Sequence, residues 1–199
     1  MNSIVHGTTN TPMLRKVRIA GALCAVGGAG WVVTSLLSSV ISQPHSVAYA
    51  LLQVPWTIVQ VLLLVGVVGL AFSGVTSGWF GTIALGIALL GRVVFVLAEI
   101  HASILVEDSI LLPVGALITA VGMTLVGIAV LRTRRWRGWQ RFTSLLVGVY
   151  PFLVMFPFIA VTGEPNTLTI SGWGLTWLLL GYAIWSSAAF EERPSQRVR

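Results

Sequence analysis

The chain of 199 residues is 56% hydrophobic and only 9% charged, with a mean hydropathy of +0.91 and a formal net charge of +6. This composition excludes a soluble globular protein, because so much apolar sequence could not be kept from water without a bilayer. The basic residues lie at the edges of apolar segments, which argues against nucleic acid as a partner, and the single Cys24 excludes a disulfide framework.

The sequence predicts an all-α, polytopic membrane protein whose spanning helices form a compact bundle. A flexible tail at residues 1–14 precedes a membrane domain at residues 15–190, and residues 191–199 form a second tail. The predicted spans are residues 19–41, 47–72, 79–101, 110–131, 142–161 and 168–188. Each run is long enough to cross about 30 Å of hydrocarbon. A cleavable signal peptide is the alternative for the first run, because residues 47–50 resemble a cleavage site, but the length of the run favours a span.

Lysine and arginine positions set the predicted orientation. Three basic residues precede the first span, five lie between the fourth and fifth spans, and three follow the sixth. A six-span threading places these groups on one side and leaves the other side with acidic residues alone. Both termini are therefore predicted to be cytoplasmic, and the arginine-rich composition favours the inner membrane of a bacterium.

A short sequence pattern recurs at corresponding places in the two halves of the chain. Ser77-Gly78-Trp79 opens the third span, Ser171-Gly172-Trp173 opens the sixth, and the middle span of each half contains a proline. Three spans per half would thread the halves in opposite directions, which is the 3+3 inverted repeat of many secondary transporters. Chance explains this recurring pattern equally well, because Gly, Trp and Pro are frequent in membrane helices.

Arg92 lies near the middle of the third span, where a charge costs about 2.5–3.5 kcal/mol. Glu99 follows on the same face two turns later, roughly 10 Å further toward the outer surface. On the second span, Gln53, Thr57 and Gln60 share one helical face. Because the two spans are antiparallel, we expect Gln60 at the depth of Arg92 and Gln53 at the depth of Glu99. The pattern predicts a polar seam between these spans.

Two interpretations of this seam remain open. Arg92 could fix helix packing by bonding to glutamines and backbone carbonyls, as buried polar side chains do in many bundles. In the other interpretation the seam lines a cavity, and Arg92 receives an anionic group or takes part in ion or proton movement. The leading hypothesis is a small membrane protein that binds or translocates a small solute or ion. No cofactor is expected, and an enzyme is the less favoured class.

Ligand-type side chains form a second group near the predicted outer surface. It consists of His45, His101, Glu107 and Asp108, with Glu99 nearby. These side chains would suit a metal ion or an acid–base set, and a membrane-embedded enzyme that uses them is the third hypothesis. Their spacing matches no metal motif, so solvated loop residues are the simpler interpretation.

Residues 132–141 form a basic loop interrupted by two tryptophans. Its cationic residues are Arg132, Arg134, Arg135, Arg137 and Arg141. The simpler interpretation is a cytoplasmic anchor that fixes orientation, and binding of anionic lipid headgroups is the alternative.

Small residues give the first span a face for close helix packing. Gly21, Cys24, Ala25 and Gly28 fall together at helical spacing and would let another helix approach. Tryptophans near span ends, Trp173 among them, are typical of interfacial belts. The second functional hypothesis is an accessory subunit that docks through the first or sixth span on a larger membrane assembly, and a homo-oligomer is a related prediction.

Overall fold

The computed structural model describes residues 11–40, 47–105, 111–163 and 166–196, and every element within them is helical. In chain order they are α1 (Thr11–Val40), α2 (Val47–Phe72), α3 (Trp79–Leu105), α4 (Leu111–Thr133), η1 (Gly138–Phe142), α5 (Thr143–Tyr150), η2 (Pro151–Met155), α6 (Phe156–Thr162) and α7 (Thr167–Gln196). As predicted, 6 stretches are long and apolar enough to cross a membrane. Helix α1 begins before the first predicted span and α7 ends after the last, so helix extends into both segments expected to be tails.

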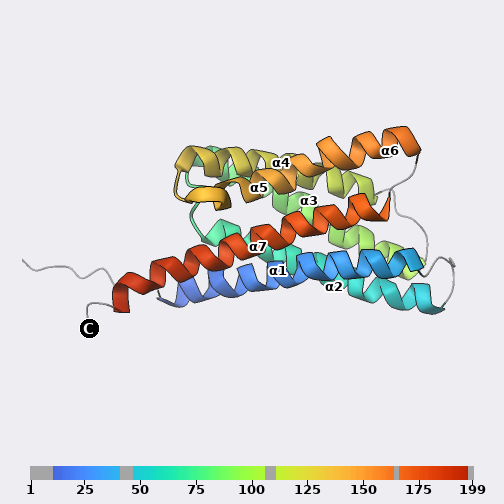
Figure 1. The fold of residues 1–199 in the computed structure, drawn as a ribbon, viewed down its shortest axis with the longest axis horizontal. Helices are drawn as coiled ribbons and strands as arrows, with labels where there is room; N and C mark the ends of the chain where they lie inside the picture. The colour runs from blue at the N-terminus through green and yellow to red at the C-terminus, as the bar shows by residue number, and fades with distance from the viewer. Residues whose placement is uncertain (1–10, 41–46, 106–110, 164–165, 197–199) are drawn as a thin grey trace, which may run out of the picture.

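Successive helices pack side by side, and α7 returns to α1, so the chain closes a ring (Figure 1). The closest pairs are α1 with α7 and α3 with α4. The start of α1, the end of α7 and the connection from α4 to α5 lie at the same end of the bundle in Figure 1. This end therefore gathers the basic segments of the described chain, and we call it the basic end.

Glycines account for the close approach of α1 and α7. A Cβ added to Gly21 would lie 2.5 Å from the backbone nitrogen of Trp185, and one added to Gly28 would clash with the α7 backbone. From the other side, Gly181 lies against the backbone of Ala25. The small-residue face of α1 is thus covered by α7 of the same chain.

The α3–α4 pair is built with the same spacing. A Cβ added to Gly115 would lie 2.9 Å from the backbone nitrogen of Phe95, and one added to Gly122 would clash with the α3 backbone. Gly91 of α3 lies against the backbone of Thr119. The two helix pairs therefore share one glycine pattern. The first helix, α1 or α4, carries two glycines separated by two turns. The second helix, α7 or α3, carries a third glycine that faces the segment between those two.

The segment from η1 to α6 is an interrupted helix, and its prolines explain where it departs from α geometry. Pro151 has no N–H and cannot bond to the carbonyl of Val147, four residues earlier. A π-helical turn, η2, begins at this proline. Trp173 of α7 uses the freed carbonyl, because its Nε1 donates to the Val147 oxygen at 2.9 Å. Trp173 lies inside the bundle with 1% of its surface exposed, so the prediction that it belongs to an interfacial belt was wrong.

Candidate binding site between α2 and α3

Arg92 lies in the interior of the bundle. It sits in the middle of α3, and its side chain is 0% exposed. A guanidinium keeps its charge under all ordinary conditions, so burial requires partners that replace its hydration. The neighbouring helices supply these partners.

Gln60 of α2 is the direct partner of Arg92. The Nη2 group of Arg92 donates to the side-chain oxygen Oε1 of Gln60, and also to the backbone oxygen of Gln60 at 3.3 Å. Gln60 is itself fully buried. The structure therefore brings these two residues to the same depth, as the antiparallel register of the two helices predicted.

Two aromatic rings cover the guanidinium. The Cζ atom of Arg92 lies 5.2 Å from the ring centroid of Phe95 and 5.0 Å from that of Trp177. Cation–π contacts of this kind are worth about 2 kcal/mol or more when both groups are desolvated. Phe95 comes from the next turn of α3, whereas Trp177 comes from α7. The contact with Trp177 was not predicted from the sequence, because nothing in the sequence indicates which face of α7 meets α3.

Glu99 is also buried, at 8% exposure, and its charge acts on Arg92. The side chain of Gln60 lies close to the Glu99 carboxylate as well, although its Nε2 group completes no hydrogen bond of good geometry among the described residues. Gln60, rather than Gln53, is thus the α2 residue that the structure places beside Glu99. Thr57 turns back to its own helix, where its hydroxyl donates to the Gln53 backbone oxygen at 3.1 Å. Arg92, Gln60 and Glu99 form what we call the α2–α3 centre.

Several N–H groups around this centre lack acceptors. Within the described residues, the Nε and Nη1 groups of Arg92, the Nε2 group of Gln60 and the indole Nε1 groups of Trp31 and Trp177 are buried without a hydrogen-bond partner. All of them are donors. Buried donors normally have partners, and leaving one unpaired costs about 1–3 kcal/mol. Beside the Glu99 carboxylate and the oxygens of Gln60, the centre therefore presents several donors that no acceptor among the described residues satisfies.

An aromatic cluster closes the centre on the side of α1 and α7. The ring centroid of Trp31 lies 5.2 Å from that of Trp173, 5.3 Å from that of Trp56 and 6.0 Å from that of Phe95. Cys24 of α1 is also fully buried, and its thiol donates to the Trp177 backbone oxygen at 3.7 Å. All these groups keep water away from the guanidinium, so an acceptor that reached it would interact in a medium of low dielectric constant.

Only part of the predicted metal site lies within the described residues. His45, Glu107 and Asp108 lie outside the described residues. His101 is exposed near the end of α3, whereas Glu99 is buried toward Arg92. Among the described residues, no group of three or more metal-binding side chains comes together. The metal site stays a prediction.

The basic loop packs against the turn between α2 and α3. Arg135 donates from Nη1 to the Gly74 oxygen at 2.6 Å, and Arg132 places its Cζ 5.1 Å from the ring centroid of Phe80. Arg134 adopts a φ of 51°, an uncommon conformation for a residue with a side chain. Arg141 lies over Phe142, and Arg137 is exposed.

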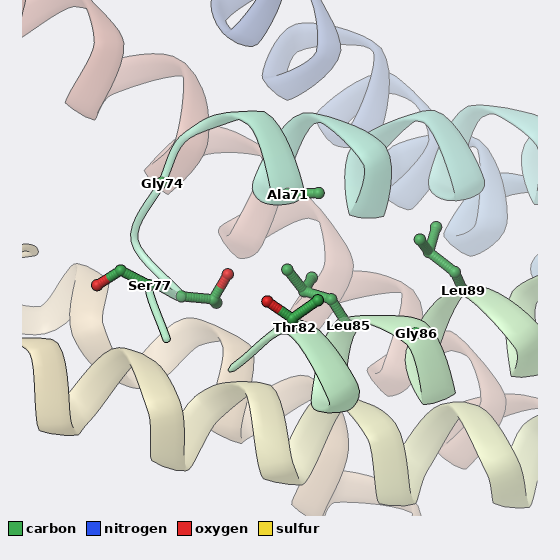
Figure 2. A pocket seen from close by; sticks show the side chains of 8 residues that line it. Ala71, Gly74, Ser77, Thr82, Leu85, Gly86 and Leu89 are labelled. Atoms are coloured by element: carbon green, nitrogen blue, oxygen red, sulfur yellow. The ribbon is translucent and has the colours of Figure 1, made fainter. Parts of the chain in front are cut away.

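A pocket of about 450 Å³ opens beside this turn, between the end of α2 and the start of α3 (Figure 2). Its lining residues are Ala71, Gly74, Thr76, Ser77, Thr82, Leu85, Gly86 and Leu89. The residues of the α2–α3 centre are not among them. The two features share the helix pair α2–α3 but occupy different levels of it.

The fold and this site define an all-helical protein with six helices long and apolar enough to cross a membrane and a guanidinium sealed between three of them. No protein-family model matches the chain, and no curated protein or solved structure matches it either.

Proposed function

We propose that the chain is a multi-pass protein of the plasma membrane, with both termini in the cytoplasm, and that it binds and translocates a small anionic solute or ion at the α2–α3 centre. The orientation rests on the basic residues, which favour the cytoplasmic side of a membrane. In this threading the basic end faces the cytoplasm, and Arg92 lies near the midplane of the bilayer.

One observation carries the assignment of the site. Arg92 is completely buried, yet its Nε and Nη1 groups have no acceptor among the described residues, and three further N–H donors around it are in the same position. An arginine that served only to fix helix packing would be expected to have its donors paired. An anion would supply the missing acceptors, and Glu99 would balance or gate the charge of Arg92 once the anion left.

The two close helix contacts, α1–α7 and α3–α4, each join one half of the chain to the other. The α1–α7 and α3–α4 pairs share their glycine spacing, and an exchange of the two halves of the chain would relate one pair to the other. A 3+3 inverted repeat, which is common among secondary transporters, would relate the two contacts in this way and supports a transport function. Arg92 on α3 meets Trp177 on α7, so the centre lies at the junction of the two pairs.

The test is binding of simple anions to the purified protein. Chloride, nitrate, acetate and phosphate are added in turn at concentrations well above the dissociation constant, and thermal unfolding in detergent is followed. A ligand at about 100 times its dissociation constant should raise the midpoint by about 5–10 °C in a chain of this size. Flux of the stabilising anion into proteoliposomes then separates translocation from binding.

Arg92→Leu should abolish the anion-dependent stabilisation and the flux while the protein still folds. Arg137→Leu, which removes a cation from an exposed position, is the matched control and should keep both. The proposal is overturned if none of the anions stabilises the wild-type protein, or if Arg92→Leu responds like the wild type. Failure of Arg92→Leu to fold, with no anion effect in the wild type, would assign Arg92 a structural role.

A further inference from the structure

The pocket between α2 and α3 has a polar end and an apolar end. Thr76, Ser77 and Thr82 bring hydroxyl groups to the end next to the turn, whereas Leu85 and Leu89 line it further along α3. Figure 2 shows these leucines on the α3 wall, with Ala71 on the facing α2 wall. An occupant that fits both ends must be amphipathic, because a polar molecule would lose hydration against the leucines without compensation.

Arginines flank the polar end. Arg135 is bonded to the oxygen of Gly74, which is itself a lining residue, and Arg132 lies over Phe80 in the first turns of α3. Both arginines are exposed, so their charge is available to an occupant. The ring of Trp79 lies 6.3 Å from that of Phe80, and 77% of its surface is exposed, as is typical of a tryptophan at the boundary between hydrocarbon and headgroups.

The mouth of the pocket lies on the outer surface of the helix bundle. Ser77, Thr82 and Gly86 are exposed, and a Cβ added to Gly86 would find nothing within 4 Å. In the proposed threading, this surface faces the cytoplasmic leaflet, where anionic lipids draw basic segments to the membrane surface. Hydrocarbon from the bilayer is therefore next to the apolar end, and phosphate groups are next to the arginines.

From this arrangement we propose that the pocket binds one anionic phospholipid, with an acyl chain along Leu85 and Leu89 and the phosphate beside Arg132 and Arg135. The headgroup gives the charge that the arginines select, and the chain fills the apolar end. A free phosphate satisfies only the polar end. This lipid site uses none of the residues of the α2–α3 centre, so it goes beyond the proposed anion site. It rests on the proposed membrane threading and not on anion binding.

The experiment is lipid retention in native mass spectrometry. The full chain is purified with phosphatidylglycerol or with phosphatidylcholine of the same acyl chains, and lipids that remain bound are counted. The wild type should retain one phosphatidylglycerol and release phosphatidylcholine. Inorganic phosphate, added as a competitor, should not displace the lipid.

Two variants address the two ends of the pocket. Gly86→Leu fills the apolar end where there is open space, and it should lower retention at least tenfold. Arg135→Gln removes one charge, and it should weaken phosphatidylglycerol binding about fivefold. The matched controls are Ala22→Leu, which places a leucine on an exposed face of α1, and Arg137→Gln in the same loop. Both controls should retain the lipid like the wild type.

The proposal is overturned by equal retention of the two lipids, by displacement with phosphate alone, or by full retention in both Gly86→Leu and Arg135→Gln. A lost anion response in Arg92→Leu with unchanged lipid retention would confirm that the two sites are separate. Should Gly86→Leu fail to fold, Arg135→Gln alone decides, because it alters an exposed side chain.

Discussion

The α1–α7 contact and the α2–α3 seam are two different kinds of interface between apolar helices. In the first, glycines bring the two backbones together, and no side chain separates them at Gly21, Gly28 and Gly181. In the second, Arg92 and Gln60 stand between the helices, and α2 and α3 pack less closely. The α1–α7 contact also contains a hydrogen bond, from the Ser171 hydroxyl to the Ser35 hydroxyl at 2.9 Å. The difference teaches that the size of the facing residues, rather than their polarity, sets how closely two helices approach.

The largest expected effect comes from enlarging a glycine of the close contacts. Gly28→Leu places a side chain where the α7 backbone lies, and Gly122→Leu does the same against α3. Each should lower the free energy of unfolding by about 3 kcal/mol, because neither backbone can move without its whole helix. Unfolding in detergent measures the loss, and Gly86→Leu, which enters open space, is the control.

Equal losses in Gly28→Leu and Gly122→Leu would strengthen the relation between the two halves. A loss confined to one of them would show that the matched glycine spacing has no common structural role. Cys24 supplies a second readout, since it is the single cysteine and is fully buried. It should react with a maleimide only when α1 separates from α7 and α2.

A smaller effect is expected in the seam. Gln60→Leu removes the hydrogen-bond acceptor of a buried cation and should cost about 2 kcal/mol. Arg92→Leu should cost at least as much, because it leaves the buried Glu99 carboxylate without a cation and the Gln60 amide without its partner. The double variant should lose less than the sum of the two single variants, since Arg92 and Gln60 are bonded to each other directly.

A double-mutant cycle with unfolding in detergent measures these differences. Additive losses from Gln60→Leu and Arg92→Leu would contradict direct coupling of the two side chains. A smaller loss in Arg92→Leu than in Gln60→Leu would show that the buried Glu99 carboxylate does not depend on the charge of Arg92.

The smallest effect has the opposite sign. Gly86 lies within α3, but an added Cβ meets nothing within 4 Å, so close packing does not require glycine there. Gly86→Ala should stabilise the helix by about 0.5–1 kcal/mol. The same unfolding assay checks it. Destabilisation would show that Gly86 is packed against another group. Gly86→Leu would then no longer serve as the control for Gly28→Leu.

The sequence led directly to the pairing of Arg92 with Gln60. A buried charge needs a polar neighbour, and the antiparallel register of two adjacent spans leaves few candidates at its depth. The sequence could not predict that Trp177 and Cys24 lie near Arg92, because contacts between helices that are distant in the chain depend on how the ring of helices closes. The recurring Ser-Gly-Trp pattern also did not indicate where its two tryptophans lie. Trp79 and Trp173 open corresponding spans, but one is 77% exposed and the other 1%, whereas the glycines carry the matched spacing.

The sequence by itself determined the number and approximate ends of the six apolar helices, because their lengths and the rarity of charge between them are local properties of the chain. It also placed the basic segments, which fall at one end of the bundle. Only the tertiary structure decided that α7 closes on α1, that Trp173 serves the carbonyl freed by Pro151, and that Arg92 is covered by rings from two helices. These outcomes depend on which helix faces meet, and that choice is made by packing among all the helices at once.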